Sequence, residues 1–496
     1  MHYTKDDNSF ISNFKKLLTK SVQIGKNIEI RIPICLILLI TLGLLYGNLF
    51  TFDNDNFFQL AHAKVLFSQG FVKEEPLTMH TGLDFLIPQW LSIVFIYLTY
   101  TYGGVVLLNL FFYIFVFSTI VIMYKTAMLI LNGDSLKSVV WTSVETLFFM
   151  LIGYTTRPHV ISLFFIALEI YVLEQYKHGK EKYIWCLPFI SVMIINFHNS
   201  LWLFFVLVGI AYLAEFMIYK TGPEKIPRNT VIASMLSLVV SLMNPYGIDG
   251  VTYIFNSLKS IQPIASYIIE LMPIGIRMET LMWLAHPFLI ILLLLYRKSN
   301  KKIPLRYVFL WLGTLLLMIQ HVRSSIQYFV CSFPIFLIAV NEIDTEVVPF
   351  RKKDLVESLV VLLLVFPIYS RRPNMDNNDD TDFMKYIEEN IPRDAVIFNH
   401  VNNGGMLELN EYKPYIDARL EVFGKDNNKK FDYLSEYVST LRGADIEEIL
   451  EKYDFEYIIL ALVTNDTDAM ENYAKKSEAW EEIYRSENSV IFQRIQ

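Results

Sequence analysis

Long apolar runs dominate this chain and constrain its fold more than any other feature. Of its 496 residues, 53% are hydrophobic and 19% are charged, and the apolar residues fall in blocks. About eleven blocks approach the ~20 residues that a helix needs to cross a bilayer. They are 32–50, 104–124, 139–155, 160–176, 184–198, 201–219, 229–245, 280–296, 306–321, 325–340 and 355–370. This pattern predicts an α-helical polytopic membrane protein.

The segments that connect these blocks predict the orientation. The connecting segments form two alternating sets, one on each side of the membrane. One set holds 22 Lys and Arg residues in total and the other holds six, and the richer set is expected to be cytoplasmic. The assignment holds only if a twelfth apolar stretch, Asp84–Tyr102, does not cross, so we predict a juxtamembrane or re-entrant helix on the outer side. The run at 32–50 follows a basic segment and lacks a small-residue cleavage site, which predicts a retained signal anchor. The protein is thus expected in the cytoplasmic membrane, with its N-terminus inside.

A composition change divides the chain. Residues 371–496 hold 15 Lys and Arg against 27 Asp and Glu, and none of the three cysteines. We predict a cytoplasmic segment (1–31), a transmembrane domain (32–370) with an outer loop (51–103), and a small extracytoplasmic α/β domain (371–496) without disulfides. The predicted elements of this last domain are helices at 382–390, 429–440, 445–453 and 465–475, and strands at 395–399, 415–416, 457–462, 481–485 and 489–494. Its acidity gives no reason to expect nucleic-acid binding.

Two carboxylates follow the first apolar block directly. Asp53 and Asp55 could hold a divalent cation such as Mg²⁺ or Mn²⁺, or take the proton of an acceptor hydroxyl. The alternative is that they only cap an amphipathic helix at 56–68. Both interpretations can hold together, with one carboxylate capping and the other reacting.

Basic and imidazole side chains recur at the predicted outer ends of other blocks. They are Arg157, His159, His198, His321 and Arg323. Ionisable groups at membrane depth are costly and usually functional, and a guanidinium can grip a lipid phosphate with two hydrogen bonds. The alternatives are a snorkelling arginine in a turn and a buried hydrogen bond of His198. We expect an outward-facing polar cavity that binds a lipid phosphate.

Two short motifs stand out in the C-terminal part. Asn402-Asn403-Gly404-Gly405 and Tyr415-Ile416-Asp417-Ala418-Arg419 follow predicted strands, where α/β sites form. A pair of glycines and a single Asp-x-Arg are also common structural devices. We therefore predict a tight turn for the first motif and an ion pair for the second.

The layout resembles the GT-C superfamily of membrane glycosyltransferases, which use polyprenyl-linked sugars on the outer face. Arg157-Pro158-His159, Asn196-Phe197-His198-Asn199 and the two C-terminal motifs are similar to those of a broad family of uncharacterised bacterial multispan proteins. That family tends to have Gly-Gly after the histidine, where this chain has Asn199-Ser200. This departure puts the role of His198 in question.

The resemblance implies a glycosyltransferase that moves a sugar from a polyprenyl-(di)phosphate carrier to an outer-face glycan, lipid or protein. Two rival hypotheses stay open. A flippase of lipid-linked glycans would need polar groups in mid-span, for which Asn109, Glu145 and Glu169 are the candidates. A non-enzymatic scaffold of envelope assembly would use only its C-terminal domain.

Overall fold

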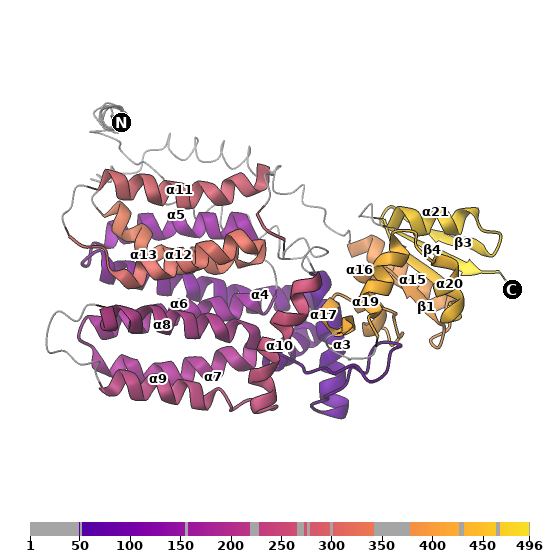
Figure 1. Cartoon of the computed structure of the whole chain (residues 1–496), viewed down its shortest axis with the longest axis horizontal. Helices are drawn as coiled ribbons and strands as arrows, with labels where there is room; N and C mark the ends of the chain where they lie inside the picture. The colour runs from indigo at the N-terminus through magenta and orange to yellow at the C-terminus, as the bar shows by residue number, and fades with distance from the viewer. Residues whose placement is uncertain are drawn as a thin grey trace, which may run out of the picture.

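The computed structural model describes residue 49 and residues 52–153, 157–218, 228–264, 272–274, 278–297, 301–341, 377–425, 431–462 and 467–495. The cytoplasmic segment 1–31, the predicted block 355–370 and all but one residue of the block 32–50 lie outside these ranges. Figure 1 shows the apolar helices side by side in one bundle, with a smaller domain at one end of it.

Every predicted apolar block within the described ranges coincides with helical structure. The bundle helices are α4 (Trp90–Ile130), α5 (Ser135–Gly153), α6 (His159–Lys177), α7 (Leu187–Phe197), α8 (Trp202–Ile218), α9 (Arg228–Val240), α11 (Met278–Tyr296), α12 (Leu305–Gln320) and α13 (Ser325–Val340). Within the described part, three helical segments are long and apolar enough to span a membrane: Trp90–Ile130, His159–Lys177 and Val322–Val340. Shorter apolar helices accompany them, so the expected number of about eleven stays a prediction.

The α4 helix contains the stretch that we expected not to cross. Its backbone breaks at Gly103 and Gly104, and Gly104 has a φ of 61°, which a glycine adopts without strain. The part before the break is tied to the α7–α8 connection, because Trp90 donates to Asn196 (2.7 Å) and Ser92 donates to the carbonyl of Phe197 (2.6 Å). The first part of α4 therefore lies at the end of the bundle where α7 ends and α8 begins.

The C-terminal domain has a four-stranded mixed sheet in the order β1-β2-β4-β3. The strands are β1 (Ile397–Asn399), β2 (Tyr457–Ala461), β3 (Trp480–Arg485) and β4 (Ser489–Arg494), and the helices are α15 (Asn377–Asn390), α16 (Val401–Leu409), α17 (Leu420–Phe423), α19 (Tyr433–Leu441), α20 (Ile446–Lys452) and α21 (Asp468–Lys476). Only β1 and β2 are parallel. Two predictions were wrong: 415–416 is not a strand, and the paired glycines lie in α16 rather than in a turn.

The outer loop and the C-terminal domain share one hydrophobic core. Ala63 of α3 (Asn54–Gln69) and Phe85 of the following loop are buried together with Phe398 and Ile416 of the C-terminal domain. A further helix at this end of the bundle, α10 (Ile248–Ile264), packs against α17. Figure 1 shows α3, α10 and α17 between the bundle and the sheet. The C-terminal domain is therefore fixed directly above one end of the bundle.

Candidate functional site

The two predicted carboxylates lie at the start of α3 and share one arginine. Arg157 Nε donates to Asp53 Oδ1 at 3.0 Å, and Arg157 Nη1 lies 3.1 Å from Asp55 Oδ2. Asp53 also caps α3, since its Oδ1 accepts from the backbone N–H of Asp55 at 3.0 Å. The capping interpretation is thus confirmed for Asp53. All three side chains are 14–21% exposed, so they remain open to a ligand.

Arg323 is exposed and lies within electrostatic range of two other predicted residues, His159 and His198; these three residues are called the Arg323 group below. Arg157 also acts on His159, which joins this group to the two aspartates. Arg323 comes from the short helix η4 (Val322–Ser324), which begins directly after His321 at the end of α12. Residues from four distant loops thus form one mixed-charge group at the end of the bundle.

The segment that carries His198 is held in place by its polar neighbours. The backbone N–H of Asn199 donates to the carbonyl of Pro88 (3.1 Å), and its side chain donates to the carbonyl of Gly250 in α10 (3.3 Å). Ser200 Oγ lies 2.9 Å from His198 Nδ1. Asn199 and Ser200, where the similar family tends to have glycines, therefore tie the imidazole to the outer loop and to α10.

A buried charge cluster joins the C-terminal domain to the outer loop. Arg419, 6% exposed, donates from Nε to Asp417 Oδ1 (2.9 Å) and from Nη2 to Glu408 Oε1 (2.8 Å). Its Nη1 lies 2.6 Å from Nε2 of His62 in α3 and contacts Glu75 in the following loop. The ion pair that we predicted between Asp417 and Arg419 is present, but it belongs to a larger cluster between the two parts.

The protonation states within this cluster follow from its geometry. Burial raises the pKa of Glu75, but the Arg419 guanidinium and His62 outweigh it and hold that pKa below its ordinary value. Burial raises the pKa of Glu408 well above its ordinary value, because Arg419 only partly compensates and Asp417 repels the charge. Burial and Arg419 lower the pKa of His62. Glu75 is therefore ionised at neutral pH, whereas Glu408 holds a proton more readily than an ordinary glutamate and His62 less readily than an ordinary histidine.

The paired glycines let α16 approach two neighbours closely, one in its own domain and one in α3. A Cβ on Gly404 would lie 2.3 Å from the carbonyl oxygen of Ile416, and one on Gly405 would lie 3.0 Å from the backbone nitrogen of Phe58 in α3. Glycine at both positions lets α16 pack backbone to backbone on its neighbours. The motif that we predicted as a turn thus lets α16 pack closely on its neighbours. The sequence analysis missed this role because it did not place the two glycines inside a helix.

The aspartate pair does not fit a resident metal ion in this arrangement. The Arg157 guanidinium occupies the position between Asp53 and Asp55 that a cation would take. Within the ranges given above, no three His, Cys, Asp or Glu side chains are grouped so that they could hold a metal. The Mg²⁺ or Mn²⁺ expectation stays a prediction, and we derive no step through a metal.

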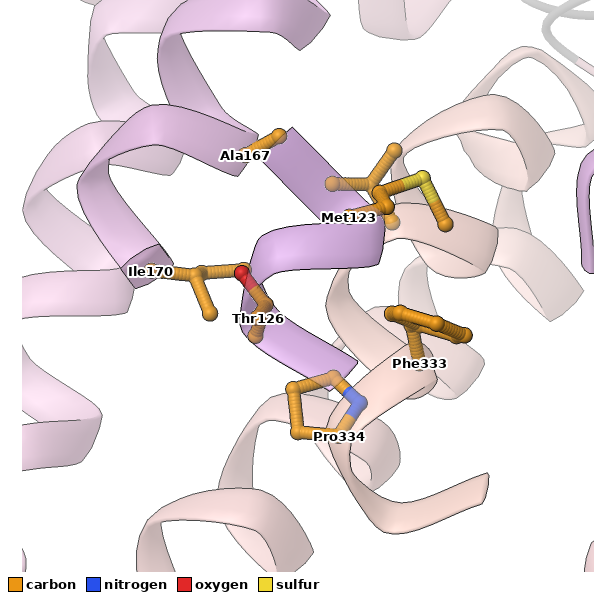
Figure 2. A pocket seen from close by; sticks show the side chains of 7 residues that line it. Met123, Thr126, Ala167, Ile170, Phe333 and Pro334 are labelled. Carbon is orange, nitrogen blue, oxygen red and sulfur yellow. The ribbon is translucent and has the colours of Figure 1, made fainter. Parts of the chain in front are cut away.

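A separate small cavity lies deeper in the bundle. Figure 2 shows its lining, which is apolar except for the Thr126 hydroxyl and includes Met123, Ala167 and Phe333. Thr126 already donates to the carbonyl of Ile122 at 3.0 Å. Because α6 rises ~1.5 Å per residue, Ala167 lies about 12 Å along that helix from His159. This cavity is therefore too far from His159 to hold the phosphate that the Arg323 group is expected to bind.

Comparisons with solved structures identify the fold as GT-C-like. The archaeal oligosaccharyltransferase AglB from Archaeoglobus fulgidus, in complex with an inhibitory peptide and a dolichol-phosphate, has a TM-score of 0.59 and 10% identity, over 93% of this chain and 74% of its own. ArnT from Cupriavidus metallidurans, bound to undecaprenyl phosphate, has a TM-score of 0.52 and 8% identity, over 93% of this chain and 97% of its own. Both are GT-C glycosyltransferases. No protein-family model and no curated protein sequence matches the chain.

Proposed function

We propose that this protein is a membrane glycosyltransferase that moves a sugar from a polyprenyl-phosphate or polyprenyl-diphosphate carrier to an acceptor on the outer face. One observation carries the proposal: two carboxylates and a basic group, drawn from four distant loops, meet at the end of the bundle that the C-terminal domain covers. The fold that the chain shares with carrier-dependent transferases supports it.

The basic group is suited to the carrier phosphate. Arg323 is exposed, so its guanidinium can grip phosphate oxygens while His159 and His198 lie close by. The apolar chain of the carrier would remain among the helices. Positive charge at this position also stabilises the phosphate as it leaves.

The carboxylates are suited to the acceptor. In the resting arrangement Arg157 neutralises Asp53 and Asp55, and it can turn toward the carrier phosphate when that group binds. One carboxylate then takes the proton of the acceptor hydroxyl, whose oxygen attacks the anomeric carbon. The bond from that carbon to the phosphate oxygen breaks, and the electron pair leaves with the phosphate. A single displacement of this kind inverts the anomeric configuration.

The flippase alternative finds little support in the described helices. Glu145 is fully buried and pairs with His286 at 3.0 Å, and Asn109 donates to the carbonyl of Leu49 at 2.9 Å. Glu169 is buried, and it does not line the cavity of Figure 2. These mid-bundle groups are enclosed and do not trace a polar path.

The test is glycosyl transfer by the double variant Asp53→Asn/Asp55→Asn. The substrates are synthetic undecaprenyl-phosphate hexose, N-acetylhexosamine and pentose, with the envelope fraction of the expressing cells as acceptor. We expect transfer to fall about 10²–10⁴-fold, which is the usual contribution of acid–base catalysis, with expression unchanged. Exposed Lys182→Ala is the control. Undiminished transfer by the double variant would contradict the role of the aspartates, whereas no transfer by wild type would favour the scaffold hypothesis.

A further inference from the structure

Glu169 is a glutamate in the middle of α6 whose carboxyl is enclosed by the bundle. It is 1% exposed, and neither Oε1 nor Oε2 forms a hydrogen bond within the described part of the chain. Because α6 rises ~1.5 Å per residue, Glu169 lies about 15 Å along the helix from His159. It is therefore an ionisable group in the bundle interior that the proposed mechanism does not use.

The other buried glutamates of the described bundle helices differ from Glu169, because each has a partner. The pairs are Glu145 with His286 (3.0 Å), Glu174 with Arg306 (2.8 Å) and Glu215 with Arg306 (2.7 Å). An ionised carboxylate that is buried without a partner is very costly, and such a group takes up a proton instead. The surroundings of Glu169 therefore favour its neutral, protonated form.

The carboxyl of Glu169 lies against α8 at a glycine. A Cβ on Gly209 would lie 3.9 Å from Glu169 Oε1, so the missing side chain leaves room for the carboxyl between the two helices. The α6 helix packs on α4, α7, α8 and α13, and no charged side chain of their described residues acts electrostatically on Glu169. The titratable group within electrostatic range is the buried Cys331 of α13.

The two helices that meet at Glu169 both begin near the candidate site. The α6 helix begins at His159, and α8 begins at Trp202, shortly after His198. Because α6 and α8 pack against each other, their contact influences the spacing of these two histidines of the Arg323 group. An unpaired negative charge at Glu169 would draw in water and separate the helices.

We propose that Glu169 is a proton-binding site inside the bundle, and that its neutral form lets α6 pack on α8. With the proton bound, the carboxyl belongs to the apolar contact with Gly209. The consequence for the Arg323 group rests on the proposed function, whereas proton binding by Glu169 does not.

Infrared difference spectra of the purified protein test proton binding directly. A protonated carboxyl has a carbonyl stretch above the amide I band, and an ionised one does not. At neutral pH this band should lose intensity in Glu169→Gln and in a second neutral variant, Glu169→Met. It should be unchanged in Glu181→Gln, which alters an exposed glutamate between α6 and α7. A band of wild-type intensity in both Glu169 variants, or an equal loss in Glu181→Gln, would overturn the proposal.

The contact with α8 is tested by the size of the side chain at position 209, with undecaprenyl phosphate binding followed by native mass spectrometry. We expect Gly209→Leu, which would crowd the carboxyl, to lose the bound lipid. Gly209→Ala and Glu169→Gln should retain it, and so should Gly313→Leu, because the space around Gly313 of α12 is open. Retained lipid in Gly209→Leu, or lost lipid in Glu169→Gln, would overturn the role of the contact. If wild type bound no undecaprenyl phosphate, the proposed function would fail, and the infrared result would still decide proton binding.

Discussion

Two neighbouring glutamates in the Arg419 cluster should differ strongly in how much stability is lost when each is replaced by glutamine. Glu75 is ionised and contacts both Arg419 and His62, whereas burial raises the pKa of Glu408, and its Oε2 has no hydrogen-bond partner in the described part of the chain. Glutamine is a close isostere of a protonated glutamic acid. We therefore expect Glu408→Gln to change stability by less than about 1 kcal/mol, since its Oε1 still accepts from Arg419.

For Glu75→Gln the expected cost is about 3–5 kcal/mol, the usual cost of breaking a buried ion pair. The substitution leaves the Arg419 guanidinium without the carboxylate that the outer loop supplies. The damage should appear where the two parts meet, so we would measure amide hydrogen exchange in α3 and α16 by mass spectrometry. Protection in both helices should fall for Glu75→Gln and persist for Glu408→Gln. Equal loss in both variants, or a larger loss for Glu408→Gln, would refute the opposite pKa shifts assigned to the two glutamates.

Three further outcomes are expected. Burial lowers the pKa of His80 from 6.5 to about 4, so the unfolded loop binds the proton first as pH falls. Docking of the loop that carries His80 should therefore lose on the order of 3 kcal/mol as the pH falls from about 6.5 to about 4. The variant His80→Phe should flatten the pH dependence of hydrogen exchange in this loop. A flat profile for wild type would contradict the prediction. Gly405→Ala crowds the backbone of Phe58 and should weaken docking of the C-terminal domain by about 1–3 kcal/mol, which would appear as easier proteolysis between the two parts. The control is Gly424→Ala, whose added Cβ would lie 3.9 Å from the Glu421 carbonyl oxygen, and it should leave proteolysis unchanged. Because Arg157 bridges the aspartates and the proposed mechanism uses no metal, EDTA should leave transfer intact. Loss of transfer that Mn²⁺ restores would contradict this mechanism and support the Mg²⁺ or Mn²⁺ prediction instead.

Much of the fold could be predicted because apolar length and charge bias are local properties of the sequence. The helices of the bundle, the break after Tyr102 and most elements of the C-terminal domain follow from such patterns. The segment at 415–416 could not be assigned in this way. There Asn399 Oδ1 accepts from the N–H of Tyr415 (2.8 Å), so a side chain takes the place of a strand partner.

The candidate site could be predicted in its members but not in its pairings. The sequence places Asp53, Asp55 and Arg157 at one level, yet no local spacing shows that a single guanidinium bridges both carboxylates. The contribution of the C-terminal domain was harder to foresee. Arg419 contacts Glu75, which lies 344 residues away in the chain, and no local pattern in the sequence shows this pairing.

The central claim is that the Arg323 group holds the phosphate of a polyprenyl-linked sugar. We would purify wild type, Arg323→Ala and Lys182→Ala in mild detergent and identify their bound lipids by native mass spectrometry. We predict a polyprenyl-phosphate or polyprenyl-diphosphate sugar on wild type and Lys182→Ala, and its loss from Arg323→Ala. Only bulk phospholipid, in equal amounts on all three proteins, would contradict the account.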